Sequence, residues 1–110
     1  MIANTPKPPY YAVIFTSMQS EDTKGYGEMA ERMCALAAQQ AGYLGFESAR
    51  DGLGIAVSYW KDEASLLAWK NNVEHMAAQR MGKKKWYNNY KTRIAKVERD
   101  YSDLESDLEC

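Results

Sequence analysis

Residues 54–90 have the sequence GIAVSYWKDEASLLAWKNNVEHMAAQRMGKKKWYNNY, and this stretch decides the fold. It predicts a strand, a helix and the start of a second strand. β-Branched and aromatic residues dominate 55–60, which is typical of a strand. Asp62 can then cap a helix through its carboxylate, and apolar residues recur after it at three- and four-residue spacing. The same stretch contains His75, the single histidine of the chain, and all three tryptophans.

The helix predicted after Asp62 has an inner stripe and a weak point. The stripe consists of Leu66, Trp69, Val73, Met76, Ala77 and Arg80. We expect Asn71 and Asn72 to bend or break the helix, because asparagine is unfavourable in a helix interior. We expect the helix to end at Gly82, and Lys83–Lys85 follow where positive charge complements a helix C-terminus.

The remaining sequence completes a pattern of four strands and two helices. The predicted elements are a strand over 10–18, a helix over 26–40, a strand over 43–50, a strand over 55–60, a helix from 62 to 82 and a strand over 86–97. Gly42 is placed for a left-handed helix cap, and Asp51-Gly52 favours a tight hairpin turn. The order strand, helix, strand, strand, helix, strand predicts an α+β, ferredoxin-like βαββαβ sandwich.

Length and composition limit the architecture and the partners. The chain has 110 residues and a formal charge of −1. We expect one domain over 10–98, an extended lead-in over 1–9 that contains three prolines, and an acidic tail over 99–110. We expect no nucleic-acid partner because the charge is near neutral, and no membrane partner because no apolar run reaches roughly 18 residues. Two cysteines and a start unlike a secretory signal predict a reducing, cytoplasmic location.

The predicted sheet has more apolar surface than its own helices can cover. The strands over 10–18 and 55–60 are apolar on both faces, whereas two helices cover one face. An exposed apolar face of that size is normally an interface. Burying roughly 600 to 900 Å² of apolar area per subunit gives a gross stabilisation on the order of 15 to 20 kcal/mol. We therefore predict a homodimer in which two open sheet faces pack together with two-fold symmetry.

Four segments of the chain occur together in a known family. They are Ser58-Tyr59-Trp60 at a strand end, Lys61-Asp62 at a helix start, Leu67-Ala68-Trp69-Lys70 and His75-Met76-Ala77-Ala78-Gln79. With these segments, residues 10–98 resemble the antibiotic biosynthesis monooxygenase superfamily of dimeric α+β barrel proteins. The resemblance implies dimers with a pocket in each subunit between the helices and the sheet. Some members of this family oxygenate polycyclic phenols with O2 and without a metal or prosthetic group, and the resemblance implies such an activity here. A related branch binds and degrades haem.

The haem-degrading branch of that family uses three residues that can be checked in this sequence. They are an asparagine on the first strand, a tryptophan on the second helix and a histidine ligand later on that helix. Trp69 matches the tryptophan, but Gln79 stands where the histidine is expected, and residues 10–18 contain no asparagine. An amide oxygen is a poor iron ligand. We therefore expect no high-affinity haem binding, and haem binding or degradation remains a third hypothesis beside the two given below. The sequence also has no Cys or His cluster for zinc, and we predict that the chain uses no cofactor.

The candidate site combines one titratable group with polar and aromatic side chains. The predicted catalytic residues are His75 and Trp69. The predicted substrate-binding residues are Tyr59, Asn72, Gln79, Trp86, Tyr90 and Arg93. His75 is the natural general base because its ordinary pKa is close to neutral pH. Aromatic walls suit a flat ligand.

Every one of these residues also has a purely structural interpretation. His75 can bond a neighbouring backbone carbonyl, and tryptophans at helical spacing can belong to the core. The arginines at 50, 80 and 93 can stabilise a phenolate or pair with surface carboxylates, and we choose Arg93 as the anion partner.

Our functional expectation is a small dimeric monooxygenase that acts on an aromatic, phenolic compound. A base deprotonates the substrate, and the electron-rich anion then reacts with O2. The alternative is a non-catalytic protein on the same scaffold, which binds a small molecule or serves in a stress response, because a fold does not fix a function.

Overall fold

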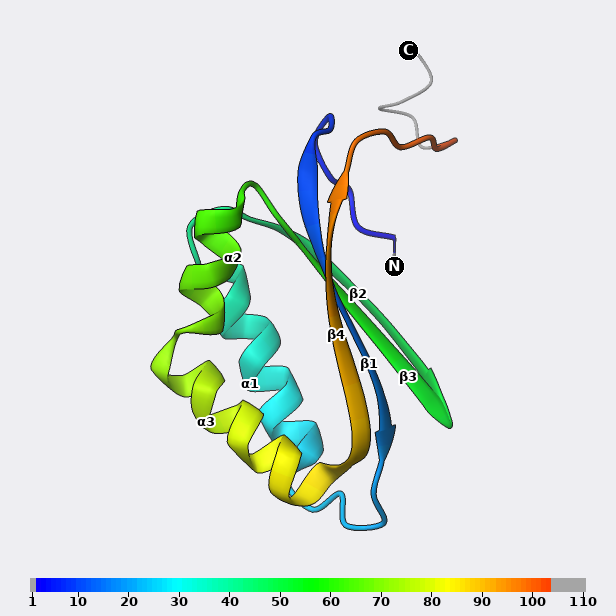
Figure 1. Ribbon diagram of the computed structural model, residues 1–110, viewed down its shortest axis with the longest axis vertical. Helices are drawn as coiled ribbons and strands as arrows, with labels where there is room; N and C mark the ends of the chain where they lie inside the picture. The colour runs from blue at the N-terminus through cyan, green and yellow to red at the C-terminus, as the bar shows by residue number, and fades with distance from the viewer. Residues whose placement is uncertain (1, 104–110) are drawn as a thin grey trace.

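The computed structural model describes residues 2–103 and contains one sheet with helices on one of its faces (Figure 1). The elements in chain order are β1 (Tyr10–Gln19), α1 (Tyr26–Ala38), β2 (Tyr43–Asp51), β3 (Leu53–Trp60), α2 (Glu63–Lys70), α3 (Val73–Met81), the π-helical turn η1 (Gly82–Trp86) and β4 (Tyr87–Val97). Within residues 2–103, no helix has the length and apolar character needed to cross a membrane.

The sheet has the strand order β2-β3-β1-β4, and every neighbouring pair is antiparallel. This arrangement confirms the predicted α+β, ferredoxin-like fold. Residues that stand opposite each other in an antiparallel pair share a face. Val13 stands opposite Ser58 and Ile94, and Val13 packs against the core under the helices. Residues in step with Val13 therefore form the helix face, and the alternate residues form the open face.

The hairpin turn forms as the sequence predicts, and Gly42 has the predicted left-handed backbone, but Gly42 is not the cap of α1. That helix ends at Ala38 with Gln39 as its C-cap residue, and Gly42 lies directly before β2. Gly42 has a φ of 83°, and a side chain at this position would overlap Ser65 at the start of α2. Only glycine satisfies both the left-handed backbone and the close approach. Asp62 caps α2, because its carboxylate accepts a hydrogen bond from the Ser65 backbone N–H at 2.8 Å. The tight hairpin turn between β2 and β3 contains Gly52 with a φ of 77°.

The helix predicted over 62–82 is broken at the two asparagines, as expected. Asn72 caps the second piece, α3, with its Oδ1 atom accepting from the backbone N–H groups of Glu74 at 3.0 Å and His75 at 3.2 Å. The predicted inner stripe does not continue through the break. Met76, Ala77 and Arg80 are exposed, because α3 begins again with its own phase.

The α-helix α3 ends at Met81 with Gly82 as its C-cap residue, as the sequence predicts. Gly82 nevertheless has helical dihedrals, φ −59° and ψ −46°, and the chain continues as the π-helical turn η1 to Trp86. Gly82 is buried, and a side chain there would approach the Tyr87 ring to 2.8 Å. The glycine therefore also permits close packing against the first residue of β4.

The buried hydrophobic core lies between α1, α2 and the C-terminal end of β3. The buried cluster consists of Ala37, Trp60, Leu66 and Trp69, and the Trp60 side chain is 0% exposed. The helix face of the edge strand β4 is less buried than this core. Tyr90 and Ile94 lie on that face and are 43% and 51% exposed. The helices therefore leave the inner side of β4 uncovered.

The segments before β1 and after β4 meet on the open face. The backbone N–H of Ala3 donates to Glu47 at 2.9 Å, and the Tyr10 hydroxyl donates to Asp100 at 2.5 Å. The acidic tail predicted over 99–110 falls from residue 104 onward outside the described residues.

Candidate functional site

Trp69 and His75 lie against each other at the break between α2 and α3. Their rings stack with centroids 4.1 Å apart and an interplanar angle of 15°. On its other side Trp69 stacks on Trp60 at 6.1 Å, and Tyr43 meets Trp60 edge-on at 5.7 Å. The four rings make a continuous series from the core of the protein to the half-buried imidazole.

The His75 imidazole has a defined tautomer. Its Nδ1 atom lies 2.9 Å from the backbone carbonyl oxygen of Trp69. A carbonyl oxygen can only accept, so Nδ1 carries the proton and Nε2 keeps a lone pair. Burial lowers the pKa of His75, and the bond to the Trp69 carbonyl opposes that shift. The neutral imidazole is therefore favoured near neutral pH, with Nε2 able to accept a proton.

This backbone bond matches the structural interpretation of His75, and it also fixes the orientation of the ring. The predicted neighbour Asn72 uses its side-chain oxygen to cap α3, so it fixes the backbone under His75. Gln79, one turn further along α3, is partly buried. Trp69, Asn72 and His75 are thus brought together by one helix break.

A second group of aromatic rings lies where η1 enters β4. Tyr26 meets Trp86 at 5.6 Å and Tyr87 at 5.8 Å, both edge-on. Phe15 contacts Tyr87 at 5.2 Å and stacks on Tyr90 at 5.7 Å. Trp86 is buried, and its Nε1–H donates to the Lys24 carbonyl at 3.0 Å. Trp86 is therefore a packing residue here, whereas Tyr90 presents an exposed ring.

Two predicted site residues lie on the open face, away from Trp69 and His75. Arg93 stands opposite Ile14, which is out of step with Val13. Tyr59 donates from its hydroxyl to Glu47 at 2.6 Å and meets Tyr10 edge-on. Burial and the neighbouring Glu47 carboxylate raise the pKa of Tyr59. The sheet itself separates this pair from the His75 group.

Arg50, one of the three arginines weighed as an anion partner, extends to the helix face, whereas the chosen Arg93 does not. Arg50 stands opposite Gly54, which in turn stands opposite Ser17, in step with Val13. Strand alternation alone places Arg50 with Phe46 and opposite in face to Arg93, so the signal was present in the sequence. Across residues 2–103, no group of three or more His, Cys, Asp or Glu residues is arranged to hold a metal ion.

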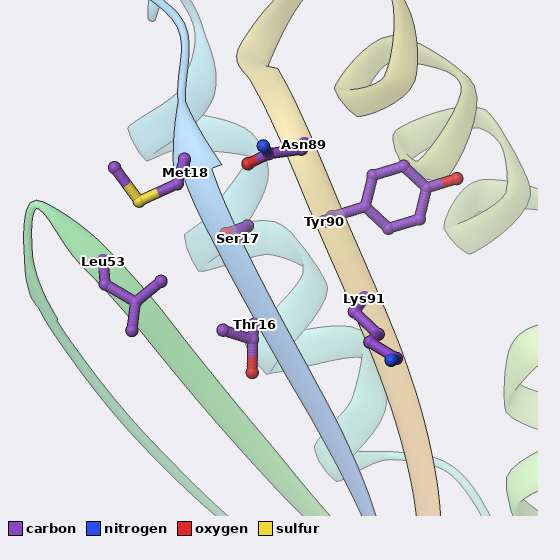
Figure 2. Close-up of a pocket in the computed structure, with 7 residues that line it drawn as sticks. All are labelled: Thr16, Ser17, Met18, Leu53, Asn89, Tyr90 and Lys91. Carbon is purple, nitrogen blue, oxygen red and sulfur yellow. The ribbon is translucent and has the colours of Figure 1, made fainter.

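A shallow hollow of about 190 Å³ lies at the hairpin end of the sheet. It is lined by Thr16, Ser17, Met18, Leu53, Asn89, Tyr90 and Lys91 (Figure 2). Most of these residues belong to the open face, and the Tyr90 ring points away from Met18 and Leu53. The hollow is therefore distinct from the Trp69–His75 group.

Comparison with known proteins gives a family match and a close relative. The model of the antibiotic biosynthesis monooxygenase family matches residues 9–81. The uncharacterized protein YqjZ of Bacillus subtilis (strain 168) is 53% identical over 100 residues, which are 89% of this chain and 88% of YqjZ.

Solved structures share the fold at low sequence identity. A mutant form of SnoaB, a cofactor-independent oxygenase from Streptomyces nogalater, aligns with a TM-score of 0.75 and 9% identity, over 87% of this chain and 100% of that one. PA3566 from Pseudomonas aeruginosa aligns with a TM-score of 0.69 and 18% identity, over 87% and 99%. At such identities the likeness demonstrates the fold alone.

Proposed function

The chain belongs to the antibiotic biosynthesis monooxygenase family, and from this premise we propose that it is a cofactor-independent monooxygenase of an aromatic, phenolic small molecule. The observation that supports the proposal most directly is the His75 imidazole, stacked on Trp69 with Nε2 unprotonated. The same activity class occurs on this fold in SnoaB.

In the proposed reaction, His75 is the general base. Nε2 accepts a proton from the substrate, while the Trp69 carbonyl holds Nδ1–H and keeps the ring oriented. The imidazolium formed in this step lies over the face of the Trp69 indole at 4.1 Å. A cation over an indole face is stabilised by the ring quadrupole, so the stack favours the charged state after proton transfer.

In the second half of the proposed reaction, the substrate anion reacts with O2. For an anthrone, the methylene carbon loses two hydrogens, one oxygen atom becomes its carbonyl oxygen, and the other oxygen leaves as water. The substrate supplies the electrons, so this balance needs no external reductant. The protein contributes orientation and exclusion of water around the anion.

The uncovered inner side of β4 is the proposed wall for the flat substrate. Tyr90 and Ile94 present an aromatic and an aliphatic side chain on the helix face. The predicted contacts from Asn72 and Gln79 belong to the same proposal, in which the buried Trp86 has a packing role. The open-face positions of Tyr59 and Arg93 favour a role for them outside this wall.

We also propose that a second copy of the chain covers the open face. Leu53 and Ile55 are 49% and 43% exposed there, and Ile14, Val57 and Met18 extend the apolar surface beside them. A self-complementary apolar face is suited to a two-fold dimer. We propose in addition that the protein is cytoplasmic, as the sequence predicts.

Oxygen uptake with anthrone or a quinol tests the activity. We expect the wild type to consume O2 and His75→Ala to lose most of this turnover, with Trp69→Phe reducing it. Lys84→Ala, an exposed change in η1, serves as the matched control and should retain wild-type rates. Unchanged turnover in His75→Ala and Trp69→Phe would refute the site assignment.

A non-catalytic binding protein is the second candidate. The contact between His75 and the Trp69 carbonyl favours it, since a structural histidine makes the same bond. Binding of phenolic compounds without any O2 uptake, across several anthrones and quinols, would favour this candidate over the enzyme.

A further inference from the structure

We propose that the helix face at the β2–β3 hairpin end binds an aromatic carboxylate, with Arg50 as the anion receptor. This inference goes beyond the monooxygenase proposal. Gly54, which stands opposite Ser17, is six positions from Trp60 along β3, and this corresponds to about 20 Å of strand. The Arg50 guanidinium therefore lies well away from the Trp69–His75 group, although this site shares the Tyr90 ring with the wall proposed for the oxygenated substrate.

The guanidinium of Arg50 is held in a fixed position across three strands. A side chain on Gly54 would overlap the guanidinium, so this glycine lets Arg50 lie across β3 and reach β1. There Nη2 donates to the Ser17 hydroxyl at 2.6 Å and Nη1 donates to the Ser17 carbonyl at 3.2 Å. Ser17 is 2% exposed, which anchors the arginine to a buried group. A third bond joins Nη1 to the carbonyl of Gly52 at 3.3 Å.

All three of these partners are neutral, and no ion pair formed within residues 2–103 involves Arg50. Within residues 2–103 the ion pairs are Arg32 with Glu74 and Lys85 with Asp22. The adjacent Asp51 alternates to the open face, opposite Leu53. A guanidinium has five N–H donors. The two that remain are on Nε and Nη2, the same two nitrogens with which Arg32 binds both oxygens of Glu74 at 2.7 and 3.0 Å.

Aromatic rings stand beside this unpaired charge. Tyr90 is directly opposite Ser17 on β4, and Phe15, the next helix-face residue of β1, stacks on Tyr90. Burial and the neighbouring Tyr26 raise the pKa of Tyr87, and the charge of Arg50 lowers it by less, so the net shift is upward. The Tyr87 phenol therefore stays protonated near neutral pH, within electrostatic reach of the guanidinium.

This combination selects the chemistry of the ligand. A carboxylate fits the remaining Nε and Nη2 donors as a fork, and a planar ring fits the walls formed by Phe15 and Tyr90. The hairpin turn projects away from the three helices (Figure 1). Arg50 is exposed, so the site is accessible from solvent. Solvent access also weakens the ion pair between Arg50 and the ligand carboxylate. We therefore expect this ion pair to improve the affinity for the ligand by about tenfold and not more.

Isothermal titration with 1-hydroxy-2-naphthoate and with its methyl ester tests the site. We expect the acid to bind the wild type about tenfold more tightly than the ester, and Arg50→Gln to remove that preference. Arg93→Gln, which removes an arginine from the opposite face, should leave it unchanged. Amide shifts on adding the acid should concentrate at Ser17 and Gly54 in NMR spectra.

Several results would overturn the proposal. They are the absence of binding at millimolar acid, equal affinities for acid and ester, and equal effects of the Gln variants at 50 and 93. If Arg50→Gln does not fold, Arg50→Lys keeps the charge and loses the fork, and it must weaken the acid several-fold without changing the ester. Loss of O2 uptake in His75→Ala with intact naphthoate binding separates the two sites.

Discussion

Replacing Asn72 with alanine removes the acceptor that begins α3 and positions His75. The side chain of Asn72 bonds two backbone N–H groups, those of Glu74 and His75. Loss of such an N-cap costs about 1 kcal/mol and at most about 2. For a chain of this length, 1 kcal/mol corresponds to a fall in Tm of about 4 °C. We therefore expect Asn72→Ala to unfold at a measurably lower urea concentration, with an unchanged m-value.

The neighbouring asparagine provides a matched control for this prediction. Asn71 is exposed at the end of α2, and its backbone N–H bonds to Leu67 whatever its side chain. Asn71→Ala should change the free energy of unfolding by less than about 0.5 kcal/mol. Asn72→Asp should keep most of the stability, because the carboxylate still accepts and suits the N-terminus of a helix.

The same substitution should loosen the imidazole, which NMR can follow. His75 lies over the Trp69 indole at 4.1 Å, so its ring protons should be shifted upfield by the indole ring current. In Asn72→Ala these shifts should move toward unstructured values, but not in Asn71→Ala. Equal destabilisation by the two alanine variants, or unaltered His75 shifts in Asn72→Ala, would refute the view that this cap builds the site.

Three other predictions concern the base, the core and the dimer. Because the pKa of His75 is lowered below its ordinary 6.5, the unfolded chain binds the proton more readily, so stability is lost as the pH falls below about 6.5. Between pH 7.5 and pH 5.5, the free energy of unfolding should fall by more for the wild type than for His75→Gln, as measured by denaturant unfolding. Trp69→Ala should cost about 3 to 5 kcal/mol in the same assay, since it empties a buried stack. Ile55→Lys should shift the protein from dimer to monomer in sedimentation, whereas Ile94→Lys, equally exposed but on the helix face, should not.

The fold could be predicted from the sequence because local and long-range signals agree. Asp51-Gly52 fixes the hairpin register, Asp62 fixes the start of α2, and alternation on the strands fixes the faces. The orientation of α3 could not be predicted in the same way. A stripe counted from Leu66 assumes one uninterrupted helix, and the Asn72 cap resets the phase, so Met76 is exposed.

The candidate site likewise contains one feature that the sequence could not predict and one that it could. The contact between Trp69 and His75 spans six residues across the break, and no helical spacing rule applies there. By contrast, the separation of Arg93 from His75 is a matter of odd and even positions on β4. The predicted set contains residues of both faces, because chemical type alone does not distinguish the two faces of a strand.

Strand parity also explains why two arginines of the same sheet differ in what they can bind. Arg93 extends from β4 into the face proposed for the second subunit, where desolvation in a dimer would require a partner for its charge. Arg50 extends to the helix face, where neutral oxygens of Ser17 and Gly52 hold it and two donors remain. A buried hydroxyl that orients an arginine without neutralising it leaves the charge available to a ligand. The anion chemistry of this chain is therefore expected at Arg50, and Arg93 is expected to respond to dimerisation rather than to small acids.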